Sequence, residues 1–329
     1  MAYPYYTGNP LRHAATPADL PIATFSRRPD PKTYMPDAGL IDAVNVALLL
    51  GQPLLLTGEP GTGKTQLAFN LAAELGYPEP LMFETKSYTM SRDVFYTYDT
   101  LGRFHAAQTQ QGSQRSLDYL TYNVLGKAIL LSRAKDDVRE WLTADFEHYG
   151  AARRSIVLID EVDKAPRDFP NDLLNEIEGM YFKIPEIGNV RIAATPEMRP
   201  IAIFTSNSEK HLPDAFLRRC VYYNIPFPDK DRLARIALAH MNQAISVNSP
   251  FLAQALDLFF TLREAATGLH KKPGTAELVG WLAAMQGMGA HLDRPLRNQT
   301  DSLKASLPVL VKNVDDQDVA RVRVETWLK

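Results

Sequence analysis

The sequence of 329 residues has little cysteine, little net charge and no long apolar run. Its single cysteine, Cys220, excludes an internal disulfide, so a reducing, cytoplasmic compartment is expected. The formal net charge of −2 argues against a surface that coats nucleic acid. No apolar run reaches the roughly 20 residues that cross a bilayer, and no apolar leader opens the chain. We therefore expect a soluble protein without a signal peptide or membrane insertion.

Metal-ligand spacing and internal repeats are missing as well. The seven histidines are scattered, so no metal site other than one for Mg²⁺ is expected. What remains is an ordinary apolar content of 45%, in a chain long enough for two domains or for one large and one small domain. Composition therefore indicates a globular protein and leaves its function to the motifs.

A glycine-rich loop is the most informative stretch of the chain. Residues 58–65, Gly-Glu-Pro-Gly-Thr-Gly-Lys-Thr, match G-x-x-x-x-G-K-[ST] at every fixed position. An apolar run at 53–57 predicts a buried strand before the loop, and helical spacing over 66–75 predicts a helix after it. A glycine-rich turn that binds nothing would not need this strand and helix. The backbone N–H groups of such a loop and the helix N-terminus attract phosphate.

The loop supplies the predicted nucleotide-binding residues. Lys64 can reach the outer phosphates, and the Thr65 hydroxyl can ligate Mg²⁺. The full set in this loop is Gly58, Glu59, Pro60, Gly61, Thr62, Gly63, Lys64, Thr65 and Gln66.

A second apolar strand ends in two carboxylates. Residues 156–159, Ile-Val-Leu-Ile, predict a central parallel strand buried on both faces, and Asp160 and Glu161 follow directly. Buried sheets do not otherwise favour carboxylates. We assign Asp160 to nucleotide-bound Mg²⁺, held through water, and Glu161 to polarising the water that attacks the γ-phosphate. The alternative is a surface acidic pair that caps the helix near Asp172.

Two further polar features follow in order. Asn207 lies in a polar turn after a predicted strand at 201–205, where an amide can orient the attacking water, although asparagine is also an ordinary turn residue. Arg218 and Arg219 end a predicted short helix, where arginines can also simply complement the helix dipole.

Composition along the chain divides it into three parts. Residues 1–36 are rich in proline and tyrosine without a period and predict an extended N-terminal arm. Residues 37–228 alternate strand and helix patterns, with a hairpin predicted at about 180–200. Residues 229–329 predict an all-helical domain, with helices at 231–242, 250–264, 275–288 and 302–310.

The order of phosphate loop, Asp160–Glu161 strand end, Asn207 and arginine pair resembles the AAA+ ATPases. The resemblance implies an α/β fold: a P-loop core with a five-stranded parallel sheet flanked by helices, and a smaller C-terminal all-α lid domain. It implies that Asn207 is the catalytic sensor 1 residue and that Arg219, with Arg218 as a second candidate, is an arginine finger inserted into a neighbouring subunit. ATP and Mg²⁺ as cofactors and a homohexameric ring follow from the same resemblance.

Within the AAA+ proteins, the sequence is most similar to the MoxR branch over about 40–290. This likeness is carried by residues 58–65, 160–165, 205–220 and 271–278. The branch carries an insert, which would lie at about 87–115, and a hairpin before sensor 1. It implies a chaperone-like ATPase that remodels or activates a protein partner, often one with a von Willebrand factor A domain. At the sensor 2 position, where many members have arginine, this sequence has Lys271 and Lys272, and we take Lys272 as a nucleotide-binding candidate.

Three other functions stay open from the sequence. A nucleic-acid motor or loader could share the core, a P-loop kinase could act on a small molecule, and a scaffold could use slow ATP hydrolysis as a switch. The aromatic-rich segment 87–104 fits a partner-contact surface and a packed core equally well.

Overall fold

The computed structural model describes residues 30–109, 115–147, 150–208, 212–241 and 245–329. These residues form two compact units: one of residues 30–59 and 63–226, and one of residues 60–62 and 227–329. Most of the predicted N-terminal arm, residues 1–29, lies outside the described residues. Of the helices in the described ranges, none combines the length and apolar character that a bilayer crossing requires.

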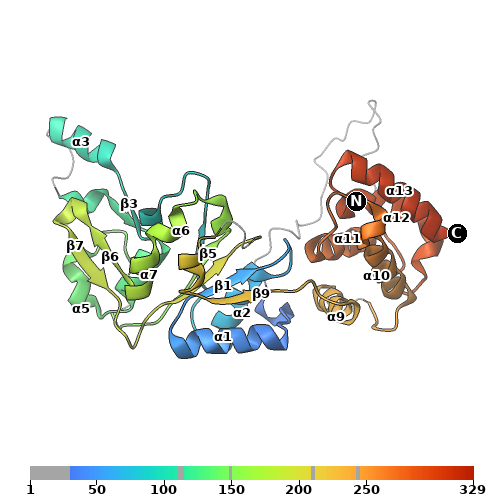
Figure 1. Ribbon diagram of the computed structural model, residues 1–329, viewed down its shortest axis with the longest axis horizontal. Helices are drawn as coiled ribbons and strands as arrows, with labels where there is room; N and C mark the ends of the chain where they lie inside the picture. Colours follow the sequence, from blue (N-terminus) through green and yellow to red (C-terminus); the bar gives the residue numbers. More distant parts are fainter. Residues whose placement is uncertain (1–29, 110–114, 148–149, 209–211, 242–244) are drawn as a thin grey trace, which may run out of the picture. The chain divides into compact units, whose positions relative to one another are not determined.

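A five-stranded parallel sheet forms the centre of the first unit (Figure 1). This confirms the predicted α/β core. Its continuous apolar strands are typical of a sheet that is covered on both faces. The order is β2-β5-β8-β1-β9, with the bounds β1 (Leu54–Thr57), β2 (Leu81–Glu84), β5 (Ile156–Asp160), β8 (Ile201–Thr205) and β9 (Val221–Asn224).

Successive strand residues belong to different apolar clusters. Leu54 and Leu56 share one cluster with residues of α1 (Ala38–Leu50) and α2 (Lys64–Glu74). Leu55 shares the other with residues of α4 (Val124–Leu131). Because adjacent side chains of a strand point to opposite faces, helices cover both faces of the sheet.

The carboxyl ends of three neighbouring strands reach the same edge of this sheet. Glu84 of β2 pairs with Asp160 of β5, and Ile159 of β5 pairs with Phe204 of β8. The residues that follow these pairs therefore lie side by side, which is where open parallel sheets place their sites.

Two small antiparallel sheets lie outside the parallel sheet. β3 (Tyr96–Tyr98) pairs with β4 (Leu120–Tyr122), and β6 (Tyr181–Ile184) pairs with β7 (Val190–Ala193). The remaining helices of this unit are α3 (Thr100–Thr109), α5 (Lys135–Val138), α6 (Phe169–Asp172), α7 (Leu174–Gly179) and α8 (Asp214–Leu217).

The aromatic segment 87–104 is divided between core and surface. Phe95 and Tyr96 are 3% exposed and lie against Phe182. Tyr88 and Phe104 are 71% and 60% exposed. Part of this segment is therefore packed core, and a partner-contact role for its exposed part stays a prediction.

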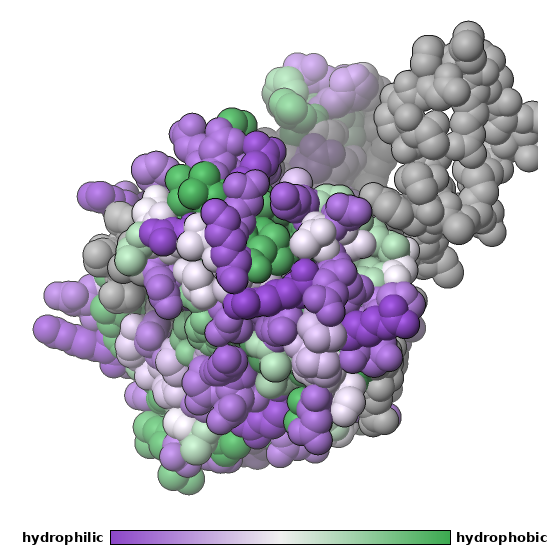
Figure 2. Space-filling model, turned by 90° about the vertical axis from the view of Figure 1, so that its right-hand side faces the viewer, coloured by the Kyte–Doolittle hydropathy of each residue, from purple (hydrophilic) through white to green (hydrophobic). Residues whose placement is uncertain are grey.

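The second unit is all helical in its described residues, as predicted for the C-terminal domain. Its core surrounds Trp281, whose indole N–H donates to the Ser306 hydroxyl at 2.8 Å. Figure 2 shows a mainly hydrophilic surface with small separate hydrophobic areas. The helices are α9 (Lys230–His240), α10 (Pro250–Arg263), α11 (Thr275–Gly287), α12 (Thr300–Leu310) and α13 (Val314–Leu328).

The last helix, α13, was not among the predicted helices. Its segment 321–324, Arg-Val-Arg-Val, alternates polar and β-branched residues as an exposed strand would. In the structure Ala320, Val324 and Trp327 are buried at helical spacing. Packing against the rest of the domain therefore overrides the local preference.

Candidate functional site

The loop between β1 and α2 folds around the side chain of Lys64. Lys64 is 7% exposed, and its ammonium group donates to the carbonyls of Gly58 at 2.8 Å and Glu59 at 3.1 Å. Burial lowers the pKa of Lys64, while the nearby carboxylates of Asp160, Asp163 and Glu161 act in the opposite direction. The ammonium group is thus held inside a loop of backbone groups, next to acidic side chains.

The last glycine of the loop is required by its surroundings. Gly63 precedes α2 with φ of 90°, and a Cβ there would lie 2.8 Å from the ring of Tyr34. Glu59, Pro60 and Gly61 are exposed at the tip of the loop. Thr62 lies between this tip and Gly63, and Gln66 lies in the first turn of α2.

Asp160 is bound by two hydroxyl groups. The Thr65 hydroxyl donates to one carboxylate oxygen at 3.0 Å, and the Thr205 hydroxyl donates to the other. Mg²⁺ prefers oxygen ligands and keeps several waters, so a hydroxyl beside a carboxylate is a donor pair that fits this ion. No cluster of three or more His, Cys, Asp or Glu in the described ranges is arranged to hold a metal by itself.

Glu161 leaves the strand in an unusual backbone conformation. Its φ is 57° and its ψ is 49°, the left-handed region, which costs a residue with a side chain about 1–2 kcal/mol. Its N–H donates to the Thr205 hydroxyl at 2.9 Å, and its carbonyl accepts from Thr85. The Glu161 carboxylate forms an ion pair with Lys164, and this hydrogen bond raises the pKa of Lys164.

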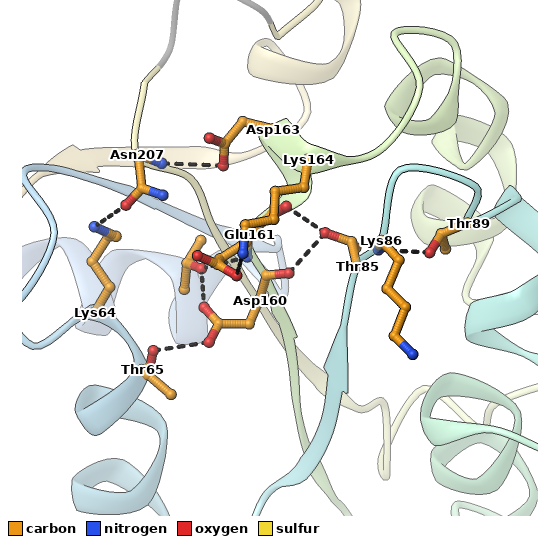
Figure 3. A network of polar contacts seen from close by, with 11 residues as sticks. Lys64, Thr65, Thr85, Lys86, Thr89, Asp160, Glu161, Asp163, Lys164 and Asn207 are labelled. Atoms are coloured by element: carbon orange, nitrogen blue, oxygen red, sulfur yellow. Dashed lines mark hydrogen bonds and ion pairs between the residues drawn. The ribbon is translucent and has the colours of Figure 1, made fainter. Parts of the chain in front are cut away.

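Asn207 joins the loop to the strand ends. Its side-chain oxygen accepts from the Lys64 ammonium group at 3.0 Å, and its N–H donates to the Asp163 carboxylate at 3.2 Å. Figure 3 shows the loop residues Lys64 and Thr65, the strand end Asp160–Glu161 and Asn207 gathered in one polar network.

The arginine pair lies apart from this network. The Arg219 guanidinium donates to the Glu178 carboxylate and the Ala215 carbonyl, at 3.0 and 3.1 Å. Arg218 is exposed at the end of α8. Lys272 belongs to the helical unit, where it is also exposed. Roles for Arg218, Arg219 and Lys272 in nucleotide chemistry stay predictions.

Sequence reasoning overlooked four polar residues of the network: Thr85, Asp163, Lys164 and Thr205. Thr85 follows β2 directly. Thr205 is the last residue of β8 and stands two positions before Asn207. A polar residue at the end of a buried strand is the signal that could have indicated them.

Comparison with known proteins identifies the family of this chain. The AAA domain family, dynein-related subfamily, matches residues 53–220. The gas vesicle ATPase GvpN of Ancylobacter aquaticus is 25% identical over 290 residues, which cover 81% of this chain and 73% of that protein.

Solved structures similar to this chain include the RuvB Holliday junction branch migration motor of Thermotoga maritima. It is 17% identical, with a TM-score of 0.43, and the alignment covers 85% of this chain and 69% of that one. A mutant of the same protein aligns over 89% and 75% of the two chains, with 17% identity and a TM-score of 0.46.

The region matched by the family includes Lys64, Asp160, Glu161 and Asn207. It also spans all strands of the parallel sheet except β9. Because residues 53–220 are more than half of the 329 residues, the protein belongs to the AAA domain family, dynein-related subfamily, and is one of the AAA+ ATPases.

Proposed function

We propose that the protein is an AAA+ ATPase of the MoxR type that hydrolyses ATP with Mg²⁺ in a ring of identical subunits and remodels a protein partner. One observation carries the hydrolytic part of this proposal. The Lys64 ammonium group contacts Asn207, and Thr65, in the next position, contacts Asp160, so loop and strand ends form one network. A glycine-rich loop that bound no ligand would not need contacts with these particular side chains.

Each residue of the network has a role in the proposed hydrolysis. The Lys64 ammonium group binds the outer phosphates, the Thr65 hydroxyl would ligate Mg²⁺, and the Asp160 carboxylate would hold this ion through water. When bound, Mg²⁺ supplies positive charge to the phosphate oxygens. Asn207 orients the water.

The Glu161 carboxylate accepts a proton from that water. The water oxygen bonds to the γ-phosphorus while the bond from this phosphorus to the ADP oxygen breaks.

The arginine pair is the basis for proposing a ring. Arg218 is exposed, and the Arg219–Glu178 ion pair is 39% and 66% exposed, so breaking this pair costs little. A guanidinium that reached a neighbouring subunit would stabilise the charge that develops on the transferred phosphoryl group. We propose Arg219, with Arg218 as the second candidate, for this role in a hexamer, and Lys272 as a further phosphate contact.

The partner is proposed by class only. The name of the GvpN relative links that protein to gas vesicles, and at 25% identity we extend its ATPase activity alone to this chain. A protein client, such as a von Willebrand factor A domain, is the partner proposed from the MoxR likeness. The near-neutral net charge of −2 favours this over a nucleic-acid track.

The test compares ATP turnover of the wild type and Glu161→Gln. We expect turnover to fall by about 10²–10⁴-fold, because the amide cannot take the proton, with ATP binding retained. Glu74→Gln, an exposed glutamate at the end of α2, is the matched control. Equal turnover in wild type and Glu161→Gln, or no assembly in the presence of a slowly hydrolysed ATP analogue, would refute the proposal.

A further inference from the structure

The left-handed backbone of Glu161 needs something to hold it. With φ of 57° and ψ of 49° directly after a buried strand, Glu161 has a conformation that persists only where its surroundings fix it. The backbone conformation also sets the direction in which the side chain leaves the strand end. The groups that hold this backbone therefore control where the carboxylate lies.

Thr205 holds the N–H side of Glu161. Its side chain is completely buried at the end of β8. The hydroxyl oxygen accepts the Glu161 N–H at 2.9 Å, and the hydroxyl hydrogen is donated to the Asp160 carboxylate. Because one hydroxyl has one hydrogen to donate, both contacts together fix its rotation.

Thr85 holds the carbonyl side from the opposite neighbouring strand. It is 3% exposed and follows β2. Its backbone N–H donates to the Asp160 carbonyl at 3.1 Å. Its hydroxyl faces that carbonyl at 2.9 Å and contacts the Glu161 carbonyl as well. The peptide units around Glu161 are therefore held from β2 on one side and from β8 on the other (Figure 3).

We propose that Thr205 and Thr85 are positioning residues for ATP hydrolysis, whose hydroxyls hold the left-handed backbone of Glu161 and so place its carboxylate. This inference rests on the proposed function of Glu161. The proposed role depends on the threonine hydroxyl rather than on side-chain shape. Valine matches threonine in volume, but its side chain neither donates nor accepts a hydrogen bond, whereas the serine hydroxyl does both.

The kinetic test uses Thr205→Val and Thr205→Ser. We expect Thr205→Val to lower kcat by about 10–100-fold with KM for ATP changed by less than about threefold, because a displaced base slows chemistry without weakening binding. Thr205→Ser should restore kcat to within about threefold of the wild type. In the Glu161→Gln background, Thr205→Val should cause no further fall, since both changes remove the same function.

A second measurement is independent of activity. Amide hydrogen exchange over residues 160–163 should be faster in Thr205→Val, because the Glu161 N–H has lost its acceptor. The matched control is Thr195→Val, in which a hydroxyl that donates to the Ser132 carbonyl at 2.9 Å is removed elsewhere in the same unit. Thr195→Val should leave both kcat and this exchange unchanged. If Thr205→Val does not fold, Thr85→Val and Thr85→Ser take the same tests.

Two results would overturn the inference while leaving the proposed function intact. One is an equal fall in kcat from Thr205→Val with and without Glu161→Gln. The other is recovery of Thr205→Val by excess Mg²⁺, which would assign the hydroxyl to Asp160 alone. Failure of the proposed function is distinct, because then Glu161→Gln itself would hydrolyse ATP at the wild-type rate.

Discussion

Two aspartates, one in each unit, are bound by different kinds of donor. Asp160 in the parallel-sheet unit accepts from the side-chain hydroxyls of Thr65 and Thr205. Asp316 in the helical unit accepts from the backbone N–H groups of His270 at 2.8 Å and Lys271 at 3.0 Å. A hydroxyl such as that of Thr65 can rotate and turn its oxygen to another partner, whereas a backbone N–H in a fixed loop cannot.

This difference in donors suits Asp160 to binding a ligand and Asp316 to holding the fold. Asp316 is 1% exposed, and its own N–H donates to the Asn313 side chain at 2.7 Å, which caps α13. Burial opposes ionisation of the Asp316 carboxyl, but the hydrogen bonds from His270, Lys271 and Asn313 outweigh it and hold its pKa below the ordinary value. Asp316 therefore fixes the loop before α11, while Asp160 stays able to exchange partners.

The largest effect is expected for Asp160→Asn. ATP turnover should fall by about 10³-fold, because an amide is a poor substitute for a carboxylate at Mg²⁺, while the thermal midpoint should change little. Asp172→Asn, an exposed aspartate on α6, is the control and should keep wild-type turnover. If Asp160→Asn instead lost much stability and kept normal turnover per folded molecule, Asp160 would be a structural acid like Asp316.

Cys220 extends the comparison to a buried thiol. For Asp316, hydrogen bonds act against the effect of burial on the pKa, whereas for Cys220 burial alone shifts the pKa. Burial raises the pKa of the Cys220 thiol to about 12. At pH 8 the thiolate fraction is then about 10³-fold below that of a free cysteine, whose pKa is about 8.5. Alkylation by iodoacetamide should be slowed by about this factor in the native protein and restored in denaturant. Fast labelling of the native protein would contradict this reasoning.

Asp316→Asn tests the structural acid. The amide cannot accept all the hydrogen bonds that the carboxylate accepts, and the loop at 270–271 loses its anchor. We expect the thermal midpoint of the helical unit to fall by about 5 °C, followed by circular dichroism. Asp318→Asn lies two residues away on the exposed side of α13 and should shift the midpoint by about 1 °C or less. Equal shifts in the two variants would show that the backbone donors contribute nothing.

The two acids also differ in how far the sequence alone predicts them. Asp160 ends an uninterrupted apolar strand, and a carboxylate in that place already indicates a site. Asp316 lies among other acids in residues 315–318, Asp-Asp-Gln-Asp, and nothing in the pattern distinguishes it. Its role depends on the contact with residues 270–271, which are far away along the chain.

The same limit applies to the partners of Asp160 and Glu161. The phosphate loop and the strands were predictable, because the loop follows a fixed spacing and the strands are apolar runs. Thr85 and Thr205 were not, because their hydroxyls meet the strand end only through the register of β2 and β8 on β5. Local sequence specifies which residues lie in strands, and the register, which joins distant segments, specifies which of them touch.

The smallest effect is the pH dependence of the Asp316 contribution. Because the folded-state pKa of Asp316 lies below the unfolded value of about 3.9, its charged form stabilises the helical unit above about pH 4. That contribution is lost as the pH falls through the folded-state pKa. The difference in thermal midpoint between the wild type and Asp316→Asn should therefore be full at pH 6 and smaller at pH 3. Other groups titrate in both proteins alike, so taking the difference isolates Asp316, and Asp318→Asn should show no such trend. A difference that stayed constant from pH 6 to pH 3 would mean that the charge of Asp316 is not what holds the loop.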